Sequence, residues 1–186
     1  LELGAGVGIT GIALAKWTAV RSVVLTDYLA NVVDNIEHNI AASLPFQPGA
    51  PDTGGTPHTA PNDALQEFCS TARLDWEEDT LETCAANKQL PAACDLIIAA
   101  DCVYDPGLAA ALARTLALLL SDRMYPRAQV VVANTVRQRQ TLEAFAEALH
   151  RNSISWAPLW PATEEHQDKF CAYPATELSA RVPQLF

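Results

Sequence analysis

Three acidic side chains stand where an α/β sheet binds its ligands. Asp27, Asp75 and Asp101 each follow directly after a short run with strand character. Because ligands of open α/β sheets bind beyond the carboxyl ends of the strands, these carboxylates are expected at one edge of the sheet. A carboxylate there can accept hydrogen bonds from sugar hydroxyls or hold a cationic substrate group.

A glycine-rich turn opens the chain, with the sequence Glu2-Leu3-Gly4-Ala5-Gly6-Val7-Gly8. Glycine lets the backbone turn tightly and approach a ligand, and the amides at the start of the next helix favour electronegative groups. The stretch from Gly6 to Gly11 also matches the dinucleotide fingerprint G-x-G-x-x-G. Read from Gly4, directly after the strand, the pattern is E-x-G-x-G-x-G. A dinucleotide turn has no need of an acid at Glu2.

The next two carboxylates suit a nucleoside. Asp27 can accept from both hydroxyls of a ribose, or it can cap the helix that follows. This acid does not distinguish a nicotinamide cofactor from another ribose-bearing one. Asp75 can accept from an adenine amino group, while Leu74 or Trp76 packs on the ring. The alternative is a core tryptophan beside a solvated aspartate.

Asp101 and Tyr104 are the candidate substrate residues. Asp105 and Pro106 already provide the cap and first residue of the next helix, so Asp101 is not needed for capping. Its carboxylate can hold an incoming ammonium group, which the ring face or hydroxyl of Tyr104 can orient. The four histidines share no metal-ligand spacing, so no metal site is predicted.

The elements that must position these residues alternate between strand and helix. Strands are predicted at 1–3, 22–26, 68–74, 95–100 and 129–134. Helical periodicity links them at 29–40 and 142–149, and the Leu- and Ala-rich stretch 108–120 reads as a buried helix. The pattern predicts a Rossmann-like α/β fold, a mostly parallel doubly wound sheet. Segments 154–157 and 177–182 are expected to pair as an antiparallel C-terminal edge.

One domain over residues 1–186 is expected, with a flexible Pro/Gly-rich insertion at 43–63 and an N-terminus truncated within the first strand. The formal net charge of −10 disfavours nucleic acid as a partner. No apolar stretch is long enough to span a membrane. Five cysteines without a CxxC pair favour reduced thiols in the cytoplasm or nucleus.

Together, the glycine turn, the Leu74-Asp75-Trp76 step and Asp101-Cys102-Val103-Tyr104 resemble the seven-strand protein-lysine methyltransferases, marked by a D-x-x-Y motif. Thr135 and Arg137 match the T-x-R motif of the branch that acts on elongation factor 2. The resemblance implies S-adenosylmethionine as cofactor and a protein substrate, with methyl transfer to lysine. It implies that Glu2, Gly4, Gly6, Gly8, Asp27, Asp75 and Trp76 bind the cofactor and that Asp101 and Tyr104 meet the substrate.

Three other functions remain open on the sequence. They are a nicotinamide-dependent oxidoreductase, a non-enzymatic binding module with a methyltransferase-like fold, and a methyltransferase that acts on a small molecule or on histidine. Glu2 and the D-x-x-Y motif speak against the oxidoreductase.

Overall fold

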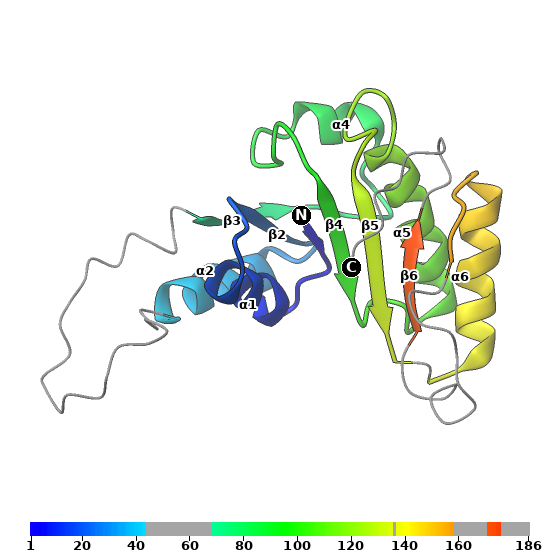
Figure 1. The fold of residues 1–186 in the computed structure, drawn as a ribbon, viewed down its shortest axis with the longest axis horizontal. Coiled ribbons are helices and arrows are strands. Elements are labelled where there is room, and N and C mark those ends of the chain that lie inside the picture. Colours follow the sequence, from blue (N-terminus) through cyan, green and yellow to red (C-terminus); the bar gives the residue numbers. More distant parts are fainter. Residues whose placement is uncertain (44–67, 136, 158–170, 176–186) are drawn as a thin grey trace, which may run out of the picture. The chain divides into compact units, whose positions relative to one another are not determined.

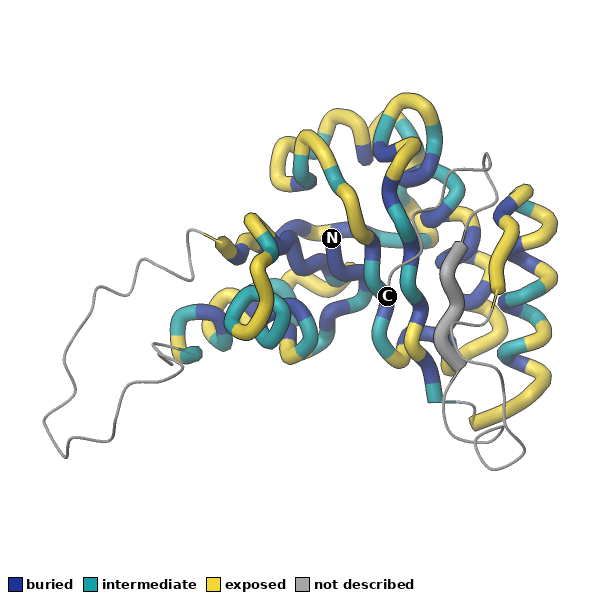
Figure 2. Tube along the Cα trace, in the orientation of Figure 1, coloured by how far each residue is buried: buried dark blue, intermediate teal, exposed yellow. Residues whose placement is uncertain are grey.

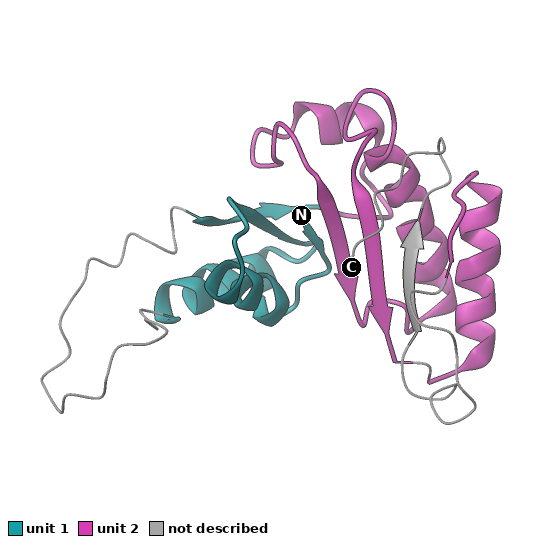
Figure 3. Ribbon diagram, in the orientation of Figure 1, with its two compact units in different colours: residues 1–74 teal, residues 75–186 magenta. Residues whose placement is uncertain are grey.

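The computed structural model describes residues 1–43, 68–135, 137–157 and 171–175. The chain forms two compact units, residues 1–74 and residues 75–186 (Figure 3). Within the described residues, every helix is too short or too polar to cross a membrane.

The first unit is a parallel sheet with two helices. Its strands are β1 (Glu2–Leu3), β2 (Val23–Asp27) and β3 (Cys69–Arg73), and its helices are α1 (Ile9–Trp17) and α2 (Ala30–Ala42) (Figure 1). β2 pairs with both other strands, with Leu25 opposite Glu2 and Asp27 opposite Arg73. Nearly all of β2 is buried (Figure 2), because helices pack on this sheet. The core cluster comprises Ala5, Ile12, Val23, Leu25, Ile36, Ile40 and Cys69.

The second unit places α5 and α6 beside a three-stranded sheet. Its elements are α4 (Leu81–Ala86), β4 (Leu96–Ala100), α5 (Pro106–Leu119), β5 (Gln129–Asn134), α6 (Arg139–Arg151) and β6 (Cys171–Ala175). β4 and β5 are parallel, whereas β6 runs antiparallel to β5. α5 packs against α6 (Figure 1), and the side chains buried in this unit include Leu112, Leu116, Leu119, Phe145 and Leu149.

Most strands and helices lie where the sequence predicts them, within one or two residues at their ends. The helix at 108–120 is confirmed as α5. Its cap is confirmed too, because the Asp105 carboxylate accepts from the amides of Gly107 at 2.7 Å and Leu108 at 3.3 Å.

The C-terminal edge of the sheet is antiparallel, as predicted, but one of the two predicted strands is absent. Residues 154–157 form no strand, only an isolated bridge at Trp156, and the strand that pairs antiparallel with β5 is β6 at Cys171–Ala175. Segment 177–182 and most of the predicted insertion at 43–63 lie outside the described residues. The described chain carries β1 to β6, so the count of seven strands and the single domain stay predictions.

Candidate functional site

The glycine turn of the first unit has the backbone its sequence predicts. Gly4, Gly6 and Gly8 have φ values of 60°, 57° and 80°, a region that side chains with a Cβ rarely adopt. The Gly8 amide donates to the Ala5 carbonyl at 2.8 Å, which closes the turn before α1. A Cβ on Gly6 would meet no atom within 4 Å, so this part of the turn borders open space.

Glu2 ties β1 to the first turn of α1. Its side chain is buried, and its Oε2 atom accepts from the Gly11 amide at 2.8 Å. Burial raises the pKa of Glu2 to about 7, although the hydrogen bond from Gly11 acts to lower it. A Cβ on Gly11 would lie 2.6 Å from Oε2 and 2.8 Å from side-chain atoms of Leu25, so any other residue there would force these side chains to shift.

Asp27 joins the end of β2 to the glycine turn. Its Oδ2 atom accepts from the Gly6 amide at 3.1 Å, and Oδ1 accepts from the amides of Tyr28 at 2.9 Å and Leu29 at 3.4 Å. The cap residue of α2 is Leu29, so the alternative role of Asp27 as that cap is wrong. A carboxylate offers about four acceptor positions, and among the described residues the donor to Oδ2 is the Gly6 amide, which leaves a second position on Oδ2 for a hydroxyl.

In the second unit, Asp75 and Trp76 lie in the turn before α4. Asp75 Oδ1 accepts from the amides of Glu77 at 3.0 Å and Glu78 at 3.3 Å. The guanidinium of Arg114 on α5 donates to the carbonyl of Trp76. Both Asp75 and Trp76 are half-buried, so Trp76 is not a fully enclosed core residue.

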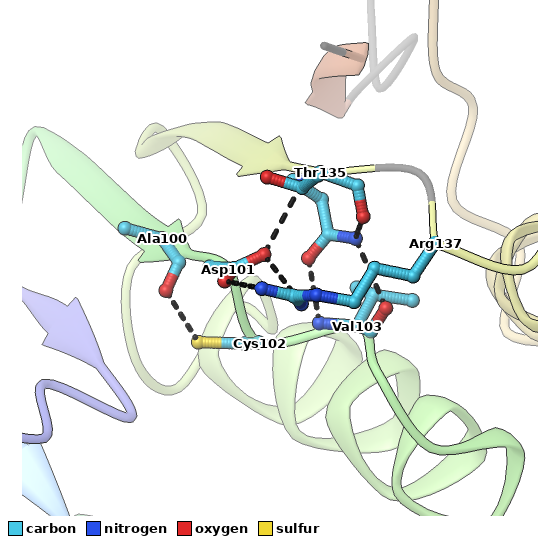
Figure 4. Close-up of polar contacts among 7 residues, drawn as sticks. Ala100, Asp101, Cys102, Val103, Thr135 and Arg137 are labelled. Atoms are coloured by element: carbon cyan, nitrogen blue, oxygen red, sulfur yellow. Dashed lines mark hydrogen bonds and ion pairs between the residues drawn. The ribbon is translucent and has the colours of Figure 1, made fainter. Parts of the chain in front are cut away.

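Asp101 is held by the segment that follows β5, and Figure 4 shows these contacts. Arg137 forms a bidentate ion pair with the carboxylate: Nη1 donates to Oδ1 at 3.0 Å, and Nη2 donates to Oδ2 at 2.6 Å. The Thr135 amide donates to Oδ1 at 3.2 Å. The hydrogen bonds from Arg137 lower the pKa of Asp101 below its ordinary value, although partial burial opposes them. Asp101 is therefore an ionised, accessible carboxylate with a cation beside it.

The backbone around Asp101 is fixed from β5 as well. Asp101 has a φ of 56°, and its amide donates to the Ala133 carbonyl at 2.7 Å. The buried Asn134 side chain accepts from the Val103 amide at 2.8 Å and donates to the Val103 carbonyl at 3.0 Å. Tyr104, two residues further along the chain from Cys102, is 58% exposed. β5 thus holds the segment 101–104 and leaves the Tyr104 ring accessible.

Sequence reasoning missed the link between these two segments. Arg137 entered only as part of a short family motif, and Asn134 only as the end of a strand. Their positions could have revealed them: Asn134 ends β5 and Arg137 follows it. The carboxyl end of β5 lies beside that of β4, where Asp101 was predicted.

Metal ligands do not gather in the described part of the chain: it contains no cluster of three or more His, Cys, Asp or Glu side chains suited to an ion. His38 and His150 are both exposed on helices.

Comparisons with known proteins indicate which family the chain belongs to. Residues 1–50 and 57–152 match a family described as lysine methyltransferase. The mouse protein-lysine N-methyltransferase EEF2KMT is 32% identical over 172 residues, which are 89% of this chain and 47% of the mouse protein. Its human counterpart is 29% identical over 175 residues, 93% of this chain and 47% of that protein. The chain thus spans about half the length of the curated relatives it matches.

Solved structures agree on the fold. Aeropyrum pernix fibrillarin, solved with natively bound S-adenosyl-L-methionine, covers 94% of this chain and is matched over 64% of its own, with a TM-score of 0.56 and 13% identity. The mitomycin 7-O-methyltransferase MmcR covers 94% of this chain and is matched over 47% of its own, with a TM-score of 0.59 and 12% identity. The predicted fold class, a Rossmann-like class I methyltransferase with a parallel sheet, is confirmed.

Proposed function

This chain belongs to the lysine methyltransferase family, and from that premise we propose that its protein transfers a methyl group from S-adenosylmethionine to a lysine side chain of another protein. The observation that carries the proposal is the extent of the family match. It covers the glycine turn, Asp27, the Asp101 segment and Arg137 in one alignment.

The residues of the first unit fit the nucleotide part of this cofactor. The turn borders open space at Gly6, and Asp27 keeps an acceptor position on Oδ2 for a ribose hydroxyl. In this proposal the glycine turn with Gly4, Gly6 and Gly8 binds the cofactor. The bound cofactor supplies a methyl group on a positively charged sulfur.

We propose a contact with the cofactor for each of the other predicted residues as well. Asp75 accepts from the adenine amino group, and the Trp76 ring packs beside it. Glu2 lies near the methionine ammonium, and its buried carboxylate is held ready by Gly11. An ammonium beside Glu2 would favour the ionised acid, against the effect of burial.

Asp101 and Tyr104 handle the substrate amine. The exposed carboxylate of Asp101 receives the lysine ammonium, and the exposed ring of Tyr104 orients it. The amine reacts only after it has lost a proton to solvent. Its lone pair then forms the new nitrogen–carbon bond while the bond from that carbon to sulfur breaks and its electron pair stays on sulfur.

We extend the proposal to elongation factor 2 as substrate and to the cytoplasm as its location. Support for the substrate comes from the mouse and human relatives named EEF2KMT, together with the T-x-R match at Thr135 and Arg137. A net charge of −10 favours approach to a basic, lysine-bearing surface.

The test begins with binding. S-adenosylhomocysteine is titrated into the purified protein by calorimetry, beside Asp27→Ala and the matched control Asp34→Ala, which removes an exposed carboxylate from α2. Saturable binding is expected in the unaltered protein and in the control, with at least about a tenfold loss in Asp27→Ala, the size of one charge-assisted bond.

Transfer is then measured with methyl-labelled cofactor and purified elongation factor 2. Label on a lysine that is absent in Asp101→Ala supports the proposal. A folded protein that binds S-adenosylhomocysteine but labels no lysine, or labels a histidine or small molecule instead, contradicts it.

A further inference from the structure

We infer that Arg137 is a positioning residue for the proposed methyl transfer, because it offsets the charge of Asp101 and leaves one acceptor position on Oδ2 for the substrate ammonium. The inference rests on the proposed function, in which Asp101 receives the lysine. It adds a second residue, from another segment of the chain, that sets how strongly the amine is held.

The count of hydrogen bonds points to a single open position. A carboxylate has about four acceptor positions, two on each oxygen. Oδ1 receives two donors, Arg137 Nη1 and the Thr135 amide, and Oδ2 receives one, Arg137 Nη2. Within the described residues, the position left is therefore on Oδ2.

The geometry keeps that position in place. A guanidinium fork fixes both the distance and the rotation of a carboxylate, which a single donor cannot do. The backbone that carries Asp101 is fixed as well. The Asp101 amide donates to the Ala133 carbonyl, and the Val103 amide donates to the Asn134 side chain. The side chains of Asp101 and Arg137 are 45% and 54% exposed, so the pair is open to an incoming side chain.

Other charged or titratable groups near Asp101 are few in the described chain. From the segment after β5, the group that acts on it is Arg137. From its own segment, the buried Cys102 thiol donates to the Ala100 carbonyl, and the Asp105 carboxylate caps α5. Tyr104 is exposed beside them. The charge that a bound amine meets is accordingly that of the Asp101–Arg137 pair.

The pair has a chemical consequence for the amine. A lone carboxylate would stabilise the ammonium form and raise the pKa of the bound lysine, which delays formation of the nucleophile. The positive charge of Arg137 cancels most of that effect. The lysine is still oriented by a hydrogen bond to Oδ2, but it gives up its proton at a lower pH.

The test compares Arg137→Gln, Arg137→Lys and a matched control, Arg139→Gln. Arg139 lies two residues away and pairs with Glu143 on α6, so its loss removes the same charge without touching Asp101. Single-turnover methylation of elongation factor 2 is followed from pH 6.5 to about pH 11, beyond the ordinary pKa of lysine. Binding of elongation factor 2 in the presence of S-adenosylhomocysteine is measured at pH 7.

In Arg137→Gln the midpoint of the rising limb is expected to move up by about one pH unit, so that the rate falls about tenfold at pH 7 and the loss becomes smaller as the pH passes the ordinary pKa of lysine, about 10.4. Binding at pH 7 should be no weaker than in the unaltered protein. Arg137→Lys retains the charge and loses the fork, so it should keep the midpoint and lose rate at every pH. Arg139→Gln should match the unaltered protein.

Two results overturn the inference alone: a rate in Arg137→Gln that falls equally at every pH together with a lower melting temperature, or an unchanged profile. The first would make Arg137 a merely structural residue, and the second would remove it from the reaction. Absence of transfer by the unaltered, folded protein overturns the proposed function, and this inference with it.

Discussion

Glu2 is an ionisable side chain that is buried away from water, where it accepts a hydrogen bond from the first turn of α1. Its relative exposure is only 2%, and the Gly11 amide donates a hydrogen bond to its carboxyl group. Because ionising a buried acid is unfavourable, the folded state prefers the protonated form, and the pKa rises from 4.5 to about 7. The stability that depends on this group is therefore fully present below about pH 4.5 and is lost as the pH rises through 7.

Glu2→Gln removes that dependence. The amide oxygen can still accept from Gly11, and no charge has to be buried at high pH. We expect the variant to be more stable than the unaltered protein at pH 8, with a much smaller difference at pH 5. Denaturant unfolding of both proteins at the two pH values, without cofactor, measures this. Curves whose separation is the same at pH 5 and pH 8 would contradict it.

At the scale of elements, the end of β5 serves as the support for the segment after β4. Asn134 bonds both the amide and the carbonyl of Val103, and these groups are buried. The strand order and the parallel register bring them together, since Ala100 lies opposite Ala133. The support is therefore a product of strand pairing and not of local sequence.

Asn134→Ala should destabilise the protein by about 2 kcal/mol or more, because it leaves two buried backbone groups of Val103 without partners. It should also lower the rate of methylation by loosening the segment that carries Asp101. The matched control is Asn152→Ala, which removes one side-chain bond to the Ala148 carbonyl at the end of α6. Equal losses of unfolding free energy in the two variants would contradict the prediction, because the two hydrogen bonds to Val103 would then contribute no more than the single bond to Ala148.

The same elements show what local sequence can and cannot specify. The glycine turn and the Asp105-Pro106 cap depend on neighbouring residues, so their positions follow from sequence alone. α4 was missed because six residues are too few to show a helical period, although Thr80 and Thr83 form its capping box. The pairing of Asp101 with Arg137 spans 36 residues and exists only once β4 and β5 are side by side.

Pattern reasoning erred at the C-terminal edge of the sheet, where it placed a strand at 154–157. The run 154–157 has strand-like residues, but Asn152 and Ser153 end α6 with a turn in which Ser153 has a φ of 59°. Strand propensity does not reveal which segment pairs with a given strand, and here the partner of β5 is β6.

At the scale of the molecule, the charge of −10 should govern encounters with a basic partner. Added salt screens this attraction, with a screening length of about 10 Å at 0.1 M. We expect kcat/KM for the proposed substrate, elongation factor 2, to fall several-fold between 50 and 300 mM NaCl, which is roughly the effect of losing electrostatic steering. Affinity for S-adenosylhomocysteine, measured in the same buffers, is the control and should change little. A kcat/KM that is constant or rises with salt would contradict this.

Each compact unit also carries a buried thiol. Cys69 in the first unit and Cys84 in the second are 5% and 2% exposed, and burial raises the pKa of both. A maleimide can reach them only when the surrounding structure opens, because reaction needs an accessible thiolate. The rate at which each thiol is alkylated can be followed separately by the mass of its peptide. Each rate therefore reports how often the structure around that thiol opens while the rest of the protein stays folded.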